Sequence, residues 1–226
     1  MLAAGRGERM RPLSDTLPKP LLPVAGRPLI VYHLEALARA GIHDVVVNLA
    51  WLGDRLRAAL GDGGRYGVRI HYSDEGAEAL ETGGGIFNAL PLLAPGSFVV
   101  VNGDTWTDFD FRHLTLDPDV DADALARLVL VPNPDHHPQG DFGLDGDVVV
   151  EHATERATFS GFGVYRPELF TGVTAGKFPL APLLNRAIAA GRVRGELYRG
   201  EWWDVGSPAR LHSLDIRLRA RAATGR

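Results

Sequence analysis

LAAGRGERMRPLSDTLPKPLLPVAG, residues 2–26, combines three glycines, three arginines, one lysine and four prolines in a stretch with little room for a helix. Gly5 and Gly7 have no Cβ, so the backbone amides between them can approach an anion closely. Arg11 adds a planar fork that suits two phosphate oxygens. A solvated surface loop could carry these charges but would not need the glycines. The pattern therefore predicts a phosphate-binding loop.

The same stretch differs from two common phosphate-binding motifs. A dinucleotide fingerprint needs a third glycine where Met10 stands, followed at once by a helix. A P-loop needs Gly-Lys-Ser/Thr, which the stretch lacks. Lys19 instead stands between Pro18 and Pro20, and the two proline rings hold the backbone around this charge nearly fixed. A lysine held in this way indicates a phosphate contact rather than a mobile surface side chain.

The composition limits the class of protein. The chain has 226 residues, of which 45% are hydrophobic and 23% charged, and this fits one globular domain. A net charge of −4 provides no general basic surface for a nucleic acid. The absence of cysteine excludes disulfides, thiolate catalysis and a cysteine-ligated zinc. No apolar run reaches the ~18 residues of a membrane span, and the first residues do not resemble a secretory signal. We expect a cytoplasmic protein without nucleic-acid or membrane partners.

Short β-branched runs alternate with helical patterns along the first part of the chain. Runs of this kind are typical of buried parallel strands. The expected strands are 44–50, 68–72, 98–102 and 126–131, and the expected helices are 27–41, 52–60 and 84–93. This alternation predicts an α/β fold with a doubly wound, mostly parallel central sheet. Such sheets bind their ligands at the carboxyl ends of the strands.

The character of the chain changes after residue 131. Residues 132–152 are rich in turns with short alternating strands. The pattern then predicts strands at 158–165 and 201–206, a helix at 180–191 and an Arg-rich amphipathic helix from Pro208. We expect one domain, 1–226, with a larger part at 1–131 and a smaller C-terminal β/α part at 132–226. Only Met1 and Leu2 precede Ala3, so we also expect the natural chain to begin several apolar residues earlier.

Two aspartates stand where a sheet presents ligands. Asp104 follows the 98–102 run, although an aspartate after a strand is often only a turn former. Asp204 follows two tryptophans in an expected strand, a poor place for an unpaired carboxylate. Two carboxylates that meet on Mg²⁺ would explain both positions. His136 and His137 are adjacent in a proline-rich loop, and we expect them to be surface residues.

The opening stretch resembles the signature of the sugar-1-phosphate nucleotidylyltransferases and departs from it only at Ser14, where threonine is usual. Three further segments, 80–93, 99–104 and 202–207, most resemble the N-acetylmuramate-1-phosphate uridylyltransferases of bacterial cell-wall recycling. The resemblance implies a Rossmann-like, glycosyltransferase-A-type fold with a nucleotide-binding part (1–131) and a sugar-binding, closing part (132–226). It implies UTP and a sugar 1-phosphate as small-molecule substrates and Mg²⁺ as cofactor.

The resemblance also assigns roles to single residues. Arg11 and Lys19 would be catalytic, and Asp104 and Asp204 would hold the metal. The nucleotide would meet Leu2, Ala3, Ala4, Gly5, Arg6, Gly7, Glu8, Arg9, Glu81, Thr82, Gly83 and Asn102. The sugar pocket would include Gly140, Asp141, Ser160 and Gly161. The glycines at 83–85 and 140–161 also fit a purely structural interpretation, as close packing and as hairpin turns.

Other functions fit parts of the sequence. Another member of the superfamily, such as a mannose-1-phosphate guanylyltransferase or a glucose-1-phosphate thymidylyltransferase, would keep the same motifs. A non-catalytic regulatory homologue would be expected to lose one of Arg11, Lys19, Asp104 or Asp204, and all four are present. A dinucleotide-binding oxidoreductase is disfavoured by Met10. The sequence leaves open the oligomeric state and the residue that would recognise the lactyl carboxylate of muramic acid.

Overall fold

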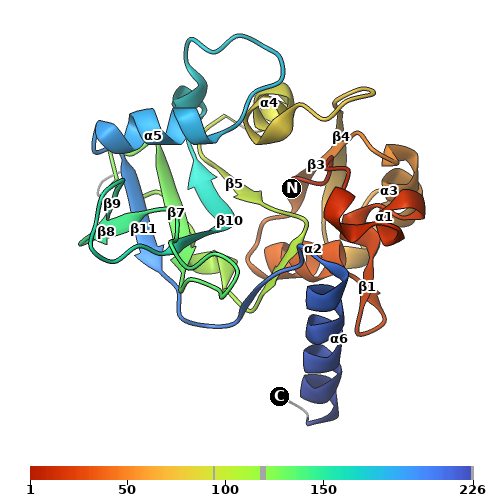
Figure 1. The fold of residues 1–226 in the computed structure, drawn as a ribbon. Helices are drawn as coiled ribbons and strands as arrows, with labels where there is room; N and C mark the ends of the chain where they lie inside the picture. The colour runs from red at the N-terminus through yellow and green to blue at the C-terminus, as the bar shows by residue number, and fades with distance from the viewer. Residues whose placement is uncertain (94, 118–120, 225–226) are drawn as a thin grey trace. The chain divides into compact units, whose positions relative to one another are not determined.

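The computed structural model describes residues 1–93, 95–117 and 121–224, and Figure 1 shows their course. The chain forms two compact units, and neither is continuous in sequence. The first unit comprises Met1–Ala79, Asn102–Asp108 and Trp202–Arg226, and the second comprises Leu80–Val101 and Phe109–Glu201. The predicted division into a nucleotide-binding part (1–131) and a sugar-binding part (132–226) concerns which residues bind which ligand. The two compact units do not test it, so it stays a prediction. None of the helices in the described ranges has the length and apolar character that a membrane crossing requires.

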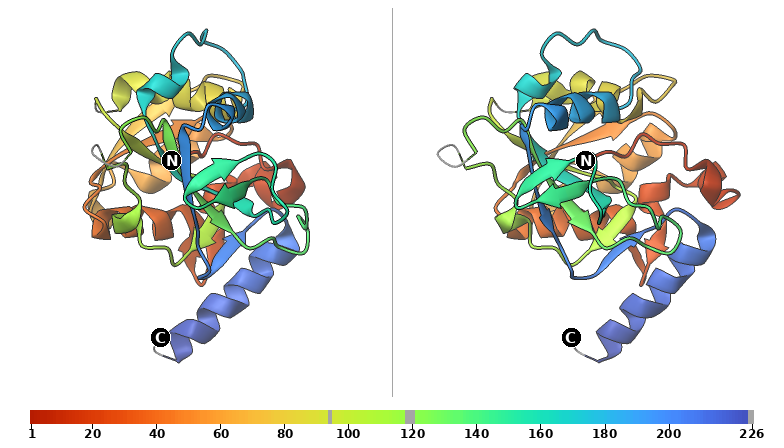
Figure 2. Two further views of the ribbon diagram at one scale, coloured as in Figure 1. Left: turned by 90° about the vertical axis from the view of Figure 1, so that its left-hand side faces the viewer. Right: turned by 60° about the vertical axis from the view of Figure 1, so that its left-hand side comes forward.

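The first unit contains four α-helices among its described residues, and the ends of α2 and α6 have clear local causes. They are α1 (Leu13–Thr16), α2 (Leu29–Arg39), α3 (Gly53–Leu60) and α6 (Pro208–Ala223). α2 stops before Gly41, whose φ of 81° is one that L-residues rarely adopt. α6 begins after Ser207, whose Oγ accepts a hydrogen bond from the Arg210 amide at 3.3 Å. Figure 2 shows α6 as one unbroken helix.

The strands of the first unit pair two by two. They are β1 (Pro23–Val24), β2 (Arg27–Pro28), β3 (Asp44–Leu49), β4 (Arg69–Asp74), β6 (Thr105–Thr107) and β12 (Trp202–Asp204). β3 and β4 are parallel, whereas β1–β2 and β6–β12 are antiparallel. Leu2 forms a parallel bridge with Asn102, and the Asn48 amide donates to the Met1 carbonyl at 3.2 Å. These bonds anchor the start of the opening stretch beside β3.

One apolar cluster joins the opening stretch to β6, β12 and α6. Leucines on one face of α6 enter this cluster, which confirms the predicted amphipathic helix. The buried members are Met10, Leu22, Val24, Leu29, Trp106, Val205, Leu211, Leu214 and Leu218. Trp106 lies two residues after Asp104, and Val205 directly follows Asp204. This cluster therefore fixes the backbone beside both candidate metal ligands.

The second unit is built on a six-stranded sheet of order β5-β10-β7-β11-β9-β8. Its strands are β5 (Phe98–Val101), β7 (Ala126–Val131), β8 (Gly143–Asp145), β9 (Val148–Val150), β10 (Thr158–Tyr165) and β11 (Val193–Leu197). Its α-helices within the described residues are α4 (Glu81–Ala89) and α5 (Ala181–Ala189). β7 and β11 are parallel, and every other neighbouring pair in this sheet is antiparallel.

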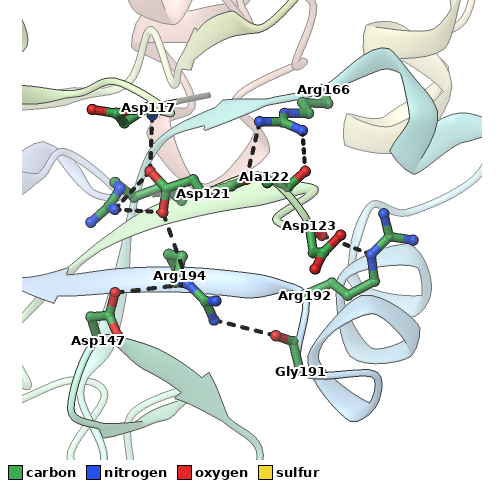
Figure 3. A network of polar contacts seen from close by, with 10 residues as sticks. Asp117, Asp121, Ala122, Asp123, Asp147, Arg166, Gly191, Arg192 and Arg194 are labelled. Atoms are coloured by element: carbon green, nitrogen blue, oxygen red, sulfur yellow. Dashed lines mark hydrogen bonds and ion pairs between the residues drawn. The ribbon is translucent and has the colours of Figure 1, made fainter. Parts of the chain in front are cut away.

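A buried aspartate ties β7 and β11 of this sheet to the loop before them (Figure 3). The Asp121 side chain is 1% exposed and accepts from Arg127 Nη2 at 2.9 and 3.0 Å, and Arg194 Nε lies 3.9 Å away. Arg166 donates to the backbone carbonyls of Asp121 and Ala122. Such a buried carboxylate needs these partners, because an unpaired charge in the interior is costly.

The structure confirms the predicted α/β class and each of the strands and helices expected from the sequence, with small shifts at their ends. Parallel pairing was expected for most of the sheet, and within the described residues it occurs in β3–β4, β7–β11 and the Leu2–Asn102 bridge. β10 is antiparallel to both its neighbours. Segment 132–157, which leads into β10, contains the β8–β9 hairpin and no helix, so it does not supply the helical crossover that usually joins parallel strands. The sequence did not predict β1, β2, β6 and β11, nor the short helix α1 within the opening stretch.

Candidate functional site

The glycine loop of the opening stretch turns sharply at Gly7, whose φ is 64°. A 3-10 turn over Glu8–Met10 follows, and the Met10 amide donates to the Gly7 carbonyl at 2.8 Å. Ser14 Oγ donates to the same carbonyl at 2.7 Å. Met10 is completely buried in the apolar cluster. The residue that replaces a third glycine therefore anchors the loop through its side chain.

Lys19 is the most confined charge of the loop region. Its side chain is 9% exposed, and its Nζ lies 2.6 Å from Asp104 Oδ2. A Cβ placed on Gly7 would lie 3.2 Å from Lys19 Cβ, so the lysine stem packs directly against the loop. The fixed backbone that Pro18 and Pro20 predict thus holds this charge beside a carboxylate.

Asp104 and Asp204 come together through the β6–β12 pair. Asp204 is the register partner of Thr105, and the Val205 amide donates to the Asp104 carbonyl at 3.1 Å. Asp204 also has a partner that the sequence did not reveal, because Arg210 Nη2 lies 3.3 Å from its Oδ2. The only local signal was the Ser207-Pro208 helix start, which places Arg210 in the first turn of α6.

Gly206 leaves room for the Arg210 guanidinium beside Asp204. A Cβ at this position would lie 1.9 Å from Arg210 Nη2 and 3.2 Å from Asp204 Oδ1. The guanidinium group therefore lies directly over the glycine backbone. The segment 202–207, quoted for its resemblance, contains this glycine.

A cavity of about 250 Å³ opens between the loop and the two strands of the first unit. It combines the glycine loop with two cations, Arg9 and Lys19, and two carboxylates, Glu8 and Asp104, residue types that suit a phosphate site with a metal. Its lining consists of Gly7, Glu8, Arg9, Met10, Lys19, Asp104 and Gly206.

Arg11 is placed differently from the expectation. Its side chain is 67% exposed, and its Nε lies 2.8 Å from Asp15 Oδ1. Arg11 does not line the cavity, whereas Arg9 does. The i,i+4 spacing of Arg11 and Asp15 was a local signal for this pair, which the phosphate interpretation did not use. A role of Arg11 in catalysis stays a prediction.

The remaining predicted nucleotide residues fall in two places. Ala3 and Ala4 are buried in the first unit, and the Asn102 carbonyl accepts from Thr105 Oγ1 at 3.0 Å. Glu81, Thr82 and Gly83 belong to the second unit, at the start of α4. Glu81 has a φ of 63°, an unusual value for a residue with a side chain.

The glycines of α4 meet their neighbour closely. A Cβ on Gly83 would lie 2.6 Å from the Phe178 ring, and one on Gly84 would lie 2.3 Å from the Gly176 carbonyl oxygen. The Gly84 amide donates to the Phe178 carbonyl at 3.0 Å. These distances confirm the close-packing interpretation of the two glycines, while the predicted contact with a base is not tested by them.

The four predicted sugar residues all lie in the second unit and all have local structural partners. Asp141 accepts from the Phe159 amide at 2.7 Å and lies 3.1 Å from His137 Nε2. Ser160 is fully buried, and its Oγ donates to the Val129 carbonyl at 2.6 Å. Gly140 and Gly161 have φ values of 61° and 87°. A role in binding a sugar therefore stays a prediction for these residues.

The donor set at the cavity fits Mg²⁺. Within the described ranges, no group of three or more His, Asp or Glu side chains could hold a metal by itself. Mg²⁺ typically takes one or two carboxylates and completes its shell with water and substrate phosphates. Asp104 lines the cavity and its side chain is 40% exposed, whereas Asp204 is 22% exposed and is not among the lining residues, although Gly206, two positions after it, is.

Comparison with known proteins identifies the family. A model of the nucleotidyl transferase family matches residues 1–157, more than half of the chain. The chain belongs to the nucleotidyl transferase family. This confirms the resemblance inferred from the opening stretch. The matched residues include the glycine loop, Lys19 and Asp104, whereas Asp204 and Arg210 lie beyond them.

Individual relatives of this nucleotidyl transferase extend the match over the whole chain. It is 51% identical to the N-acetylmuramate alpha-1-phosphate uridylyltransferase of Neisseria meningitidis serogroup B over 216 residues, 93% of this chain and 94% of the relative. The enzyme of the same name from Caulobacter vibrioides is 37% identical, with 96% and 95% of the two chains covered. A Bacillus anthracis protein solved in complex with sucrose has the same fold, with a TM-score of 0.80 at 22% identity over 96% of this chain and 93% of that one.

Proposed function

We propose that this protein transfers the uridylyl group of UTP to N-acetyl-α-muramate 1-phosphate, giving UDP-N-acetylmuramate and pyrophosphate. The observation that carries the proposal is the 51% identity over almost the full length of both chains to an enzyme with that name. The cavity supports it, because residues of the glycine loop, Lys19 and Asp104 line one space in the unit that contains the family signature. The proposal places the reaction in the cytoplasm, where UTP is made, and in the recycling of cell-wall sugars.

The proposed chemistry needs no general base. The second pKa of a phosphate monoester lies near ~6, so the sugar 1-phosphate is already largely a dianion at neutral pH. One of its oxygens attacks the α-phosphorus of UTP, the bond from that phosphorus to the bridging oxygen breaks, and pyrophosphate leaves. The enzyme must position two polyanions and offset their repulsion.

The residues of the cavity supply these two effects. The amides of the Gly5–Arg9 loop and the Arg9 side chain would hold the β- and γ-phosphates, which leave together. Lys19 would lie nearer the reacting phosphorus, since its Nζ is fixed beside Asp104. Arg11 would reach the leaving group only after release from Asp15. Contacts that strengthen as charge develops in the transition state contribute roughly 3–4 kcal/mol each.

Asp104 and Asp204 would hold Mg²⁺. When bound, the ion neutralises phosphate charge between the two substrates. Arg210 would keep Asp204 in place beside Gly206, and Lys19 would do the same for Asp104. Glu81, Thr82 and Gly83 would contact the base, and the residues at 140–141 and 160–161 the sugar, as the resemblance implies.

Pyrophosphate release tests the proposal. UTP, dTTP, GTP, CTP and ATP are crossed with the 1-phosphates of N-acetylmuramate, N-acetylglucosamine, glucose and mannose in the presence of Mg²⁺. We expect UTP with N-acetylmuramate 1-phosphate to exceed every other pair in kcat/KM by about 100-fold or more, a difference of roughly 2.7 kcal/mol in transition-state binding. Asp104→Asn, measured in parallel, controls for a contaminating activity.

The other outcomes separate the alternatives. Turnover of a different pair would retain nucleotidyl transfer and replace the assigned sugar and base. No turnover of any pair by the folded protein would contradict the proposed reaction and favour a regulatory homologue.

A further inference from the structure

Trp51 lies just beyond the carboxyl end of β3 and contacts the glycine loop in two ways. Its indole Nε1–H donates to the Ser14 carbonyl at 3.1 Å. Its ring lies under the guanidinium of Arg6, with Arg6 Cζ 4.5 Å from the ring centroid. A cation at this distance over the face of a tryptophan is attracted by the electron-rich ring. One side chain therefore supports two separate points of the opening stretch, Arg6 and Ser14.

The Arg6 guanidinium is open to a ligand. Its side chain is exposed, and within the described part of the chain it has no hydrogen-bond or ion-pair partner. Arg11, by contrast, is paired with Asp15. Stacking on a ring occupies one face of the guanidinium and leaves its N–H groups free at the edge. Arg6 is thus held in place by Trp51 without losing the donors that a phosphate would need.

The second contact reaches the turn of the loop. Ser14 is 1% exposed, and its Oγ donates to the Gly7 carbonyl at 2.7 Å. A Cβ on Gly7 would lie 3.3 Å from Ser14 Cβ, so these residues also pack together. Trp51 fixes the backbone of Ser14, and Ser14 fixes the orientation of the Gly7 peptide. Gly7 and the three residues that follow it line the cavity.

We infer that Trp51 is a positioning residue of the nucleotide site, which holds Arg6 and, through Ser14, the Gly7 turn in the arrangement that receives the triphosphate. This inference rests on the proposed function, since it takes the loop to bind UTP. Trp51 touches neither substrate nor reacting atoms in this account. Its effect is preorganisation of the loop, which acts on nucleotide binding rather than on the chemical step.

The test is a double-mutant cycle of Arg6→Met and Trp51→Leu. We expect each single variant to raise the KM for UTP by about three- to ten-fold, with kcat changed by less than about two-fold. Trp51→Leu already deprives Arg6 of its support. The double variant should therefore have the KM of Trp51→Leu alone, a non-additive result. Trp51→Phe, which keeps a ring and loses the N–H donor, should lie between wild type and Trp51→Leu.

The chain offers a matched control. Arg57 lies over the Tyr72 ring at the same distance of 4.5 Å, in the same unit but away from the loop. Arg57→Met removes an equivalent exposed cation and ring contact, and it should leave KM and kcat unchanged. Circular dichroism and the unfolding midpoint show whether Trp51→Leu is folded. Should it not fold, Trp51→Phe tests the Ser14 contact alone, because it removes the indole N–H and keeps a ring under Arg6, and an unchanged KM for UTP in this variant would then overturn the inference.

A second measurement separates the inference from the proposed function. The Kd of inorganic pyrophosphate, measured by calorimetry, reports on the loop without any uridylyl transfer. The same non-additive weakening of pyrophosphate binding supports the inference even for a protein that uses another nucleotide. An unchanged KM and Kd in Trp51→Leu, or independent effects of the two substitutions, would overturn it. A wild-type protein that transfers no uridylyl group, while the two substitutions still weaken pyrophosphate binding non-additively, would contradict only the proposed function.

Discussion

Lys19 Nζ lies 2.6 Å from Asp104 Oδ2, although the two residues are 85 positions apart in sequence. The cation that the sequence assigned to phosphate and the carboxylate that it assigned to metal are therefore each other's partners in the absence of substrate. Lys19 is almost enclosed, whereas Asp104 is 40% exposed at the cavity. The pair keeps both charges balanced and in position before the polyanions arrive, so little reorganisation is needed on binding.

Lys19→Met is the first prediction. Methionine fills the space of the lysine stem and removes its charge. We expect kcat/KM to fall by about 10²–10³, because a charge fixed beside the reacting phosphorus is lost. The exposed Asp104 stays hydrated, so the free energy of unfolding should change by no more than about 1 kcal/mol. Steady-state kinetics and urea unfolding measure the two effects. A loss of activity below ten-fold would contradict the role of Lys19.

Asp104→Asn and Asp204→Asn test the metal ligands separately. Each asparagine keeps the shape and removes the charge that Mg²⁺ requires, so we expect turnover to fall below detection while the fold is retained. Electron paramagnetic resonance of Mn²⁺ with UTP should show binding weakened by about ten-fold or more in each variant. Asp44→Asn is the control, since Asp44 is likewise paired with an arginine, Arg69 at 3.1 Å, but at the start of β3. Normal Mn²⁺ binding in Asp204→Asn would remove that residue from the site.

The local parts of this site follow from the sequence. The glycines, the prolines around Lys19 and the β-branched runs act over a few residues, and the structure shows the expected turn, confined lysine and strands. The bend at Gly7 is an example, because its φ of 64° is one for which glycine is the usual residue.

The pairings could not be predicted in the same way. Whether Asp204 meets Arg210, or Lys19 meets Asp104, depends on how β6, β12 and α6 assemble, and no local pattern encodes this. The contacts of Trp51 with Arg6 and Ser14 could not be predicted either, because a tryptophan after a strand is usually a core residue. The antiparallel course of β10 was missed because a buried β-branched strand looks alike in either direction.

Gly5→Ala tests whether the loop needs bare backbone for a ligand or for its own fold. A Cβ on Gly5 meets no atom within 4 Å, and its φ is not in the left-handed region. We expect unchanged stability with a KM for UTP raised by about ten-fold, because the methyl group would stand where phosphate approaches the amides. Gly7→Ala is the matched comparison. Its positive φ and its contacts with Lys19 and Ser14 should cost about 1 kcal/mol of stability as well. Wild-type kinetics in Gly5→Ala would contradict a phosphate site at this loop.

His33 makes the fold sensitive to acid. It is 1% exposed on α2, and its Nε2–H donates to the Thr105 carbonyl at 2.7 Å, next to Asp104. Burial lowers the pKa of His33 from 6.5 to about 4, against the smaller opposing effects of the Thr105 hydrogen bond and the Asp104 charge. Between these two values the unfolded chain binds a proton that the folded chain does not. The stability is therefore fully present above about pH 6.5 and is lost as the pH falls towards about 4.

His33→Gln should remove this acid sensitivity, because glutamine can still donate to the Thr105 carbonyl but does not titrate. From the shift of the pKa, the His33 contribution to the wild-type free energy of unfolding should fall by about 3 kcal/mol over the whole interval, most of it already lost near pH 5. Urea unfolding of both proteins at about pH 7, 6 and 5 measures the difference in slope, and the other titrating groups cancel in the comparison. Glutamine packs less well than imidazole, so His33→Gln should be the less stable protein near pH 7 and the gap should narrow on acidification. Parallel curves for the two proteins would show that His33 is not the group responsible.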